Sequence, residues 1–283
     1  MKRSLLYFLA VALFFITPVS ADTLIAQETY SLYDYVKKTS NYSGSITPSE
    51  NSFNIVIDGK EISVGITGWS DTGSGSDNIL EQGILDGWYN CDINKSPCTT
   101  QNRKYGYGLQ NVESGDSHSI DNYSGGKDFD MFLLSFDTAV SIQGAGFSWK
   151  RNSSDKEITV AGLKNSSGFG SDLNLTWASV AGNVFENAIG HFSTTYNASA
   201  GLYESKFKDI TQTAKYWIVG AYNTHFDTSS NKHQGVGLKL STLDIALHKE
   251  KVTPPPTEVS EPGALALMSL GLGLVLYRRK RRV

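Results

Sequence analysis

The chain has 283 residues, of which 40% are hydrophobic, 25 are Lys or Arg and 28 are Asp or Glu. Seven of the basic residues and one acidic residue lie in the terminal segments 1–21 and 259–283, so the part between them keeps 18 basic and 27 acidic residues and a formal net charge of −9. Such an acidic body excludes the usual electrostatics of nucleic-acid binding, because the phosphate backbone attracts basic surfaces. It suits solubility outside a cell and the binding of cations.

Residues 1–21 have the organisation of a secretory signal peptide. Lys2 and Arg3 precede an unbroken apolar run at 5–16, and Val19-Ser20-Ala21 supplies the small residues that a signal peptidase reads. We expect cleavage before Asp22 and export of the rest. An uncleaved anchor is the alternative, although the run is shorter than the about 20 apolar residues of a permanent span.

The body, residues 22–248, shows short alternating apolar runs that are separated by turn residues. Asp58-Gly59 between the runs 53–57 and 62–66 predicts a hairpin, since both turn residues must adopt positive φ. Its two apolar faces comprise Phe53, Ile55 and Ile57 on one strand and Ile62, Val64 and Ile66 on the other. Further strands are expected at 131–136, 140–149, 157–163, 173–177, 216–222 and 235–247, with one short helix near 32–36. This pattern predicts an all-β fold, an antiparallel, jelly-roll-like β-sandwich.

Cys91 and Cys98 are separated by six residues that include Asn94 and Pro97. In an exported chain two close cysteines usually pair, and the two turn-forming residues favour the approach of the sulfurs. We therefore expect a Cys91–Cys98 disulfide. A zinc site is disfavoured, because the spacing is unusual for zinc and no second Cys/His pair follows.

Residues 249–258 contain three consecutive prolines and read as an extended linker. Residues 259–283 then combine the motif Val259-Ser260-Glu261-Pro262, an apolar stretch, and a basic stop made of Arg278, Arg279, Lys280, Arg281 and Arg282. The stretch predicts a transmembrane helix of about 22 Å, short for a hydrocarbon core of about 30 Å. The basic residues would face the cytoplasm and the body the outside. A plain single-span anchor is the alternative.

This order of short motif, apolar helix and basic cluster resembles the PEP-CTERM sorting signal of Gram-negative bacteria. Family members usually read Pro-Glu-Pro, whereas this chain has Ser260-Glu261-Pro262. The resemblance implies that signal peptidase and then an exosortase, a membrane-embedded cysteine transpeptidase-like enzyme, process the chain during export. It also implies transient anchoring in the inner membrane and delivery to the cell surface or extracellular matrix, in systems that usually accompany exopolysaccharide production.

The body is similar to a family of exosortase-dependent surface proteins. The similarity lies in the His118-x-x-Asp121-Asn122 loop, a following strand that ends in Phe136-Asp137, and a second strand that ends at Trp149. That family has no assigned activity, so the similarity adds a fold class and a location without chemistry.

One tetrapeptide and one tripeptide match catalytic motifs, but the residues around them argue against an enzyme. Asp71-Thr72-Gly73-Ser74 matches one half of an aspartic protease site, which needs a second such aspartate to share a proton, and none occurs. Gly115-Asp116-Ser117 matches an esterase nucleophile block, yet polar residues precede it where an apolar strand is needed. We expect no catalytic residues.

An oxygen-rich loop at residues 116–130 is the candidate metal site. Asp116, Asp121, Asn122, Asp128 and Asp130 lie among glycines, and Ca²⁺ takes six to eight oxygen ligands from such loops. The alternative is a loop whose Asx side chains hydrogen-bond the neighbouring backbone. Calcium is the only cofactor that the sequence suggests.

The sequence is consistent with two functions. One is a structural or interaction role in a surface layer or biofilm matrix. The other is a carbohydrate-binding module for extracellular polysaccharide, with sugar-stacking rings drawn from Trp69, Trp88, Trp149, Trp177 and Trp217. Most aromatic residues of a sandwich lie in its core, so burial of these five side chains decides how many are available.

Overall fold

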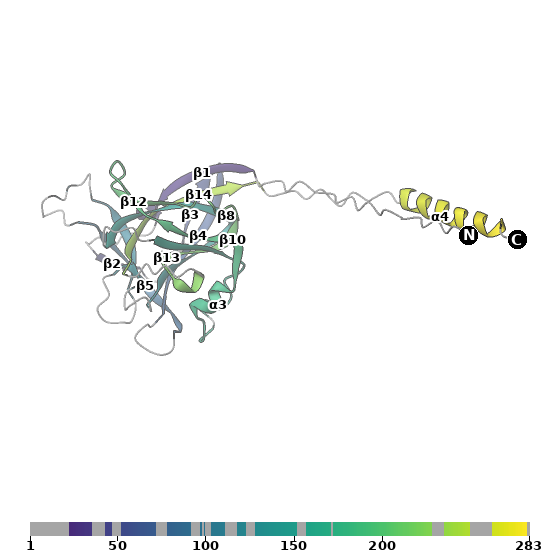
Figure 1. Cartoon of the computed structure of the whole chain (residues 1–283). Coiled ribbons are helices and arrows are strands. Elements are labelled where there is room, and N and C mark those ends of the chain that lie inside the picture. Colours follow the sequence, from purple (N-terminus) through teal and green to yellow (C-terminus); the bar gives the residue numbers. More distant parts are fainter. Residues whose placement is uncertain are drawn as a thin grey trace, which may run out of the picture. The chain divides into compact units, whose positions relative to one another are not determined.

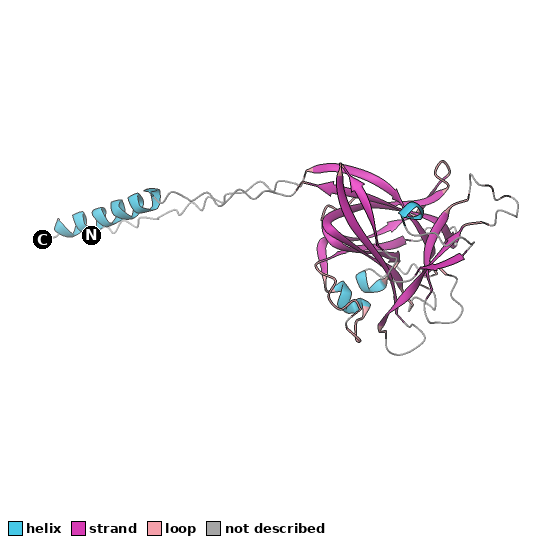
Figure 2. Cartoon of the chain, turned by 180° about the vertical axis from the view of Figure 1, so that it is seen from behind, coloured by secondary structure: helices cyan, strands magenta, loops and turns pink. Residues whose placement is uncertain are grey.

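The computed structural model describes residues 23–35, 43–46, 52–71, 78–91, 97, 99, 103–110, 118–122, 128–151, 157–170, 172–227, 235–249 and 262–281. The signal peptide and almost all of the linker lie outside these residues. The chain divides into two units, Met1–Lys249 and Glu250–Val283, which are described separately. Figures 1 and 2 show that strands dominate the first unit.

The elements of the first unit are β1 (Leu24–Ser31), α1 (Leu32–Tyr35), β2 (Ser43–Ile46), β3 (Ser52–Ile57), β4 (Lys60–Asp71), β5 (Leu80–Tyr89), β6 (Tyr105–Gln110), β7 (Ile120–Asp121), β8 (Asp130–Arg151), β9 (Glu157–Leu163), α3 (Trp177–Ala181), β10 (Val184–Ser193), β11 (Thr195–Asn197), β12 (Leu202–Lys206), β13 (Ala214–Ala221), the 3₁₀ helix η2 (Thr224–Phe226) and β14 (Gly237–His248). Every strand pairing among the described residues is antiparallel. The all-β prediction is confirmed.

Two layers of strands share β8 and β5. The first part of β8 pairs with β4 and β13, and its second part pairs with β14 and β12. The first residues of β5 pair with β4, and the rest pair with β6 and β2. We call the layer with β3, β4, β13, β9 and β10 sheet B, and the layer with β1, β14, β6, β12 and β11 sheet A. Strands that pass from one layer to the other make the corners of orthogonal sheet packings.

These shared strands change the predicted architecture. The hydrogen-bonded path β14–β6–β5–β4–β8 returns to β14, so five strands form a closed barrel instead of two separate sheets of a jelly-roll-like sandwich. The physical reason lies in β8. The sequence predicted two strands, 131–136 and 140–149, but the backbone stays extended through Asp137, Thr138 and Ala139 and one strand of 22 residues turns the corner.

The predicted hairpin is confirmed. Asp58 and Gly59 have φ of 50° and 74°, and the register pairs Ile55 with Ile62 and Phe53 with Val64. The six apolar side chains of its two inner faces are buried. The strands at 157–163, 216–222 and 235–247 and the short helix near 32–36 are confirmed as well, within a few residues.

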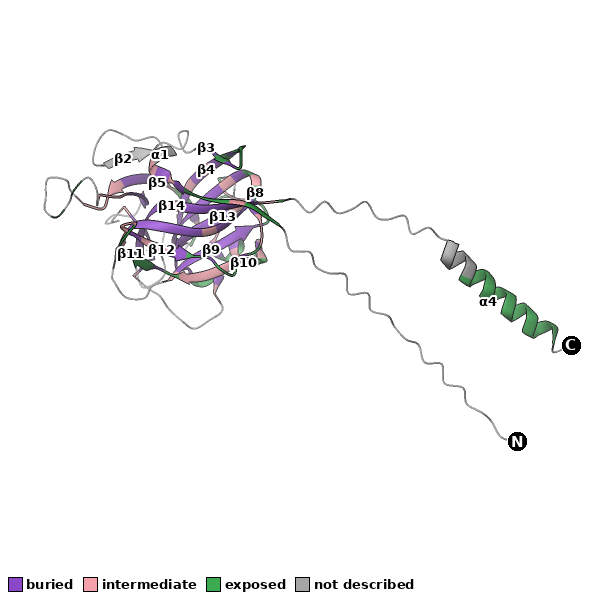
Figure 3. Cartoon of the chain, turned by 90° about the horizontal axis from the view of Figure 1, so that it is seen from above, coloured by how far each residue is buried: buried purple, intermediate pink, exposed green. Residues whose placement is uncertain are grey.

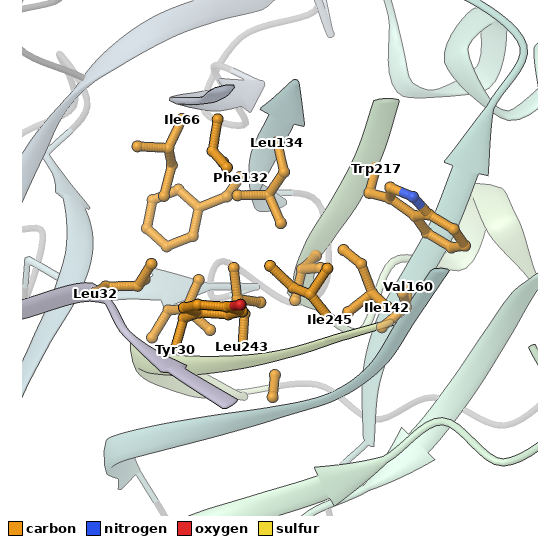
Figure 4. Packing of buried hydrophobic residues seen from close by; sticks show 14 of the residues in the cluster. Tyr30, Leu32, Ile66, Phe132, Leu134, Ile142, Val160, Trp217, Leu243 and Ile245 are labelled. Atoms are coloured by element: carbon orange, nitrogen blue, oxygen red, sulfur yellow. The ribbon is translucent and has the colours of Figure 1, made fainter. Parts of the chain in front are cut away.

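Sheet B is covered on both faces by apolar side chains. The larger core lies between the two sheets, and Figure 4 shows Phe132, Leu134 and Trp217 of sheet B facing Leu243 and Ile245 of sheet A. A second cluster on the opposite face of sheet B includes Met131, Leu133 and Ile218, and α3 and η2 cover it with Trp177, Val180 and Phe226. The burial of alternate neighbours on both faces explains the continuous apolar runs of β8 and β13.

The strand predicted at 173–177 is wrong, because the helix α3 begins at Trp177. Thr176 caps it, since its hydroxyl accepts from the Ser179 backbone N–H while the Ser179 hydroxyl accepts from the Thr176 N–H. This capping box is a local signal for a helix. The alternating apolar pattern at 173–177 favoured a strand, and the prediction followed that pattern.

The described residues of the second unit form the helix α4 (Pro262–Lys280), whose described side chains are exposed (Figure 3). The predicted helix is therefore confirmed. Its predicted crossing of a membrane is corrected: no helix in the described part of the chain is long and apolar enough to span one. The reason is that basic residues occupy the last turn of α4, so its apolar stretch ends at Tyr277.

Candidate functional site

The sorting motif lies mostly outside the described residues. Val259, Ser260 and Glu261 are not described, and Pro262 is the first residue of α4. Proline is well suited to the first position of a helix, because its missing N–H would have no partner there.

The basic stop extends past the end of α4. Arg278, Arg279, Lys280 and Arg281 are exposed, and the Arg281 guanidinium lies 5.6 Å from the centroid of the Tyr277 ring. Arg282 is outside the described residues. Within the described residues, α4 therefore begins at the last residue of the motif and ends in the basic stop.

One of the two cysteines of the predicted disulfide lies within the described residues. Cys91 lies two residues after the end of β5 and is not a free cysteine. Cys98 lies outside the described residues, so the Cys91–Cys98 pairing stays a prediction.

The described members of the oxygen-rich loop are buried and join distant segments. The Asn122 side chain donates to the carbonyl of Tyr222 (2.7 Å) and accepts from the backbone N–H of Val236 (2.7 Å). Asp121 accepts from the Ser119 hydroxyl at 2.8 Å. Asn122 thus links the loop to residues that follow β13 and precede β14, which the sequence did not predict.

Asp130 and Asp128 also accept hydrogen bonds in the interior. Asp130 Oδ2 accepts from the Asp121 backbone N–H (3.3 Å), and Asp128 Oδ1 accepts from the Ser70 hydroxyl (3.4 Å). Within the described ranges no three His, Cys, Asp or Glu side chains are grouped so that they could hold a metal ion. Asp116 lies outside these ranges, and calcium binding stays a prediction.

Asp71, the aspartate of the protease-like tetrapeptide, is 1% exposed. Its Oδ1 accepts from the backbone N–H of Phe129 at 2.6 Å. The carboxylate therefore links the end of β4 to the start of β8 by a hydrogen bond, which is a structural role for this aspartate. Gly115, Asp116 and Ser117, the esterase-like block, lie outside the described residues.

The five tryptophans separate into two groups. Trp69, Trp177 and Trp217 are 6%, 1% and 0% exposed and belong to the core clusters. Trp88 and Trp149 are only partly buried. The core therefore buries three of the rings, whereas the other two keep part of their surface accessible.

Trp88 and Trp149 converge on one lysine. Lys239 Nζ lies 5.6 Å from the Trp88 ring centroid and 5.9 Å from that of Trp149, within the range of cation–π interactions. The same ammonium donates to the carbonyl of His118 at 2.9 Å. His118 Nδ1 in turn lies 2.7 Å from Asp86 Oδ2. We call these five residues the tryptophan–lysine cluster.

Strand alternation places the cluster on the side of sheet A that faces away from the core. Leu85 of β5 and Leu238 and Leu240 of β14 point into the core, so Asp86, Trp88 and Lys239 between and beside them point the other way. Trp149 is the register partner of Lys239 on β8. Three strands that are distant in sequence thus bring the two indoles together.

Two glycines of β6 make room for the cluster. Gly108 pairs with Asp86, and a Cβ at Gly108 would collide with the His118 carbonyl. Gly106 pairs with Trp88, and a Cβ there would meet the backbone of Lys239 at 2.8 Å. Glycine inside a strand often marks such a close approach.

His118 has a left-handed backbone with φ of 54°, an uncommon conformation for a residue with a Cβ. Its carbonyl and ring are both held, by Lys239 and Asp86 respectively. The ring lies 5.3 Å from that of Trp88. The surrounding contacts therefore stabilise a strained residue beside the partly buried ring of Trp88, and strained residues often cluster at functional sites.

The inner side of the same strands is apolar and aromatic. Burial, followed by the nearby Asp86 charge, raises the pKa of Tyr105 to about 12, and burial also raises the pKa of Tyr107. These phenols stay neutral at physiological pH. The Tyr105 and Tyr107 rings are 5.2 Å apart, so they form a packed support under the cluster.

Sequence reasoning identified Trp88, Trp149 and His118 but did not join them, and it missed Asp86 and Lys239. The available signal was the alternation of tyrosine and glycine in Tyr105-Gly106-Tyr107-Gly108, which leaves one face of that strand without side chains. Lys239 interrupts an apolar run of the sequence, which indicates that its side of the strand faces away from the core.

Comparison with protein family models, with curated proteins and with solved structures finds no match for this chain.

Proposed function

We propose that this chain is an exported surface or matrix protein that an exosortase processes at its C-terminal tail, with a structural or interaction role and no catalysis. The observation that supports it is the continuity of the tail. The helix α4 begins at the motif proline Pro262, and its last turn contains Arg278, Arg279 and Lys280. Eight large apolar side chains between them are 59–76% exposed, so no described partner covers them.

The processing is tested by expressing the full chain in a Gram-negative host with and without an exosortase. We expect the intact mass to fall by the segment that follows the motif, only when the enzyme is present, and the product to appear at the cell surface. Replacing Glu261 by Gln should prevent the cleavage, whereas replacing Glu258 by Gln in the preceding linker should not. Retention of the full mass with an active exosortase would contradict the proposal.

A second candidate function is the binding of extracellular polysaccharide, which the tryptophan–lysine cluster favours. Indole rings stack on the C–H faces of pyranose rings, and they do so only when the core leaves them accessible. Trp88 and Trp149 are the partly exposed pair, and Lys239 holds both. Lys239 itself is only 8% exposed, so we assign it the role of positioning the rings.

Polysaccharide binding is tested by affinity electrophoresis of the full chain in gels that contain exopolysaccharide from exosortase-bearing bacteria. The polysaccharide should retard the native chain, and Trp88→Ala and Trp149→Ala should each weaken binding by tenfold or more. Leu173→Ala is the control, because Leu173 is 86% exposed and outside the cluster. Equal retardation of all three variants and the native chain would exclude the cluster as the binding site.

A further inference from the structure

Two tyrosine rings lie side by side at the edge of sheet A. Tyr196 of β11 and Tyr203 of β12 are register partners, so both side chains leave the hairpin on the same face. Their ring centroids are 5.0 Å apart, and the ring planes are inclined by 55°. Asn197 and Glu204, which share a hydrogen bond of 3.0 Å, belong to the opposite face. The two phenol rings are therefore direct neighbours on one face of the hairpin.

The turn and the strand behind it limit the movement of the two rings. The Asn197 carbonyl accepts from the Gly201 backbone N–H at 2.8 Å, and Gly201 adopts the left-handed φ of 67° that this turn needs. Tyr203 pairs with Phe147 of β8 and packs against the main core. The Tyr203 ring is thus held from the core side, and a closer approach of the rings requires a movement of Tyr196 alone.

The two rings differ in exposure. Tyr196 is 56% exposed, and it is the only exposed residue among the tyrosines of the body whose side chains are described. Tyr203 is partly buried. An oxidant at the surface therefore reaches Tyr196 first, and the neighbouring ring is close enough to give up an electron through it.

The separation of the rings suits a carbon–carbon bond between them. In a biaryl the ring centres lie one bond length plus two ring radii apart, and the 5.0 Å between Tyr196 and Tyr203 exceeds this by less than one bond length. The rings of a biaryl with substituents next to the bond are twisted out of one plane, so the observed inclination need not be removed. Groups that folding holds this close react far faster than separate molecules, because the entropy of bringing them together is already lost.

The other close tyrosine rings are less accessible. Tyr105 is 7% exposed, although its ring lies 5.0 Å from that of Tyr33 and 4.8 Å from that of Tyr89. The guanidinium carbon of Arg103 lies 3.4 Å from the Tyr89 ring centroid and covers that ring. None of these three rings is as exposed as that of Tyr196, so a surface oxidant has no comparable entry to this group.

We propose that Tyr196 and Tyr203 form an intramolecular dityrosine cross-link when the chain meets hydrogen peroxide and a haem peroxidase. The peroxidase takes one electron and one proton from each phenol and reduces one hydrogen peroxide to two waters. The two phenoxyl radicals couple between ring carbons next to the oxygens. The hydrogens on these two carbons then move to the oxygens, which restores both phenols.

The cross-link would secure the outermost strand of sheet A. β11 has three residues, and among the described strands it pairs with β12 alone. A short edge strand with one partner opens easily, whereas a covalent bond to Tyr203 would hold β11 to a strand that β8 already fixes. The inference depends neither on the processing of the tail nor on the tryptophan–lysine cluster.

The test treats the purified full chain with hydrogen peroxide and a haem peroxidase. Both tyrosines fall in the tryptic peptide 165–206, which contains no third tyrosine. We expect this peptide to lose the mass of two hydrogen atoms, dityrosine fluorescence to appear, and the chain to remain monomeric on a denaturing gel. Chymotryptic cleavage after Leu202 should leave the two tyrosine-containing fragments joined.

Tyr196→Phe and Tyr203→Phe should each abolish the mass loss, because phenylalanine keeps the ring but forms no phenoxyl radical. Tyr216→Phe is the matched control, since Tyr216 is also partly buried and its register partners on β8 and β9 are Ser135 and Leu163. The melting temperature of each variant shows whether the body remains folded. If the native peptide keeps its mass, if cross-linked dimers form instead, or if a folded Tyr203→Phe variant still loses the two hydrogens, the proposal is wrong.

Discussion

His118 shows how single residues of this chain are placed against their local preference. A non-glycine residue in the left-handed region costs of the order of 1 kcal/mol or more, and here Lys239 and Asp86 hold it there. Gly108 is the residue that permits this arrangement, because any side chain would occupy the position of the His118 carbonyl. The tryptophan–lysine cluster thus requires glycine at Gly108, because even the methyl group of alanine would collide with the His118 carbonyl.

We expect Gly108→Ala to displace His118 and to lower the free energy of unfolding by about 1–3 kcal/mol, the range for overpacked interiors. Polysaccharide retardation should weaken in the same variant, because Trp88 loses its neighbour. Gly65→Ala is the matched control, since a Cβ there would meet only ordinary contacts, the nearest at 3.7 Å. Denaturant unfolding and gel retardation measure the two effects, and a stability equal to that of Gly65→Ala would contradict the prediction.

The buried phenol of Tyr105 should make stability depend on alkaline pH. Its pKa is about 12 in the folded chain against the ordinary 10, so between these values the folded state holds a proton that the unfolded state has released. The free energy of unfolding should therefore fall as pH rises from 10 to 12, by about 2–3 kcal/mol for two pKa units. Tyr105→Phe should reduce this loss.

Urea unfolding at a series of pH values, with phenolate absorbance read in parallel, measures this dependence. Tyr196→Phe is the control, because Tyr196 is 56% exposed and lies outside the core. An unchanged alkaline slope in the Tyr105→Phe variant would show that another group is responsible.

At the scale of elements, the strand β8 determines the architecture. Its first part lies between β4 and β13 and its second part beside β14 and β12, so one element belongs to both layers. The sequence predicted its two apolar runs correctly, because alternation and β-branched content depend on local burial. It could not predict that Asp137 and Ala139 continue the strand, since exposed residues are also typical of turns.

The helix α3 should depend on its capping box. We expect Thr176→Ala to lower the free energy of unfolding by about 1 kcal/mol, because the Ser179 N–H loses its acceptor and the helix covers the second core cluster. Thr211→Ala is the control, because Thr211 is exposed and lies outside any helix or strand. Thermal unfolding of both variants, followed by circular dichroism, measures the difference.

Secondary structure was predictable where a local rule applied, and the candidate sites were not. Asp58-Gly59 fixes its hairpin through positive φ, whereas Trp88, Lys239 and Trp149 meet only because β5, β14 and β8 assemble side by side around β6. Such sites follow from strand order, which a single sequence does not specify.

At the scale of the whole molecule, the chain should carry one covalent cross-link. We predict that Cys91 and Cys98 form a disulfide in the exported protein, and that the double variant Cys91→Ser/Cys98→Ser loses about 2–3 kcal/mol of stability, the value expected for so short a loop. Mass spectrometry of non-reduced peptides identifies the bond. A free thiol at either position in protein recovered from the cell surface would contradict the prediction.

The strand β14 runs from the tryptophan–lysine cluster to the residue before the linker. Lys239 of the tryptophan–lysine cluster lies near its beginning, and His248, next to the linker, is its last residue. A polymer that stacks on Trp88 and Trp149 would pull on β5 and β8, whereas a force on the linker would pull on β14, which pairs with β8. β1 and β8 flank it, and their hydrogen bonds run across the direction of pull, so many must fail together before the strand moves. If the chain acts as proposed, its body should therefore resist a load between bound polysaccharide and linker better than a domain whose hydrogen bonds break one pair at a time.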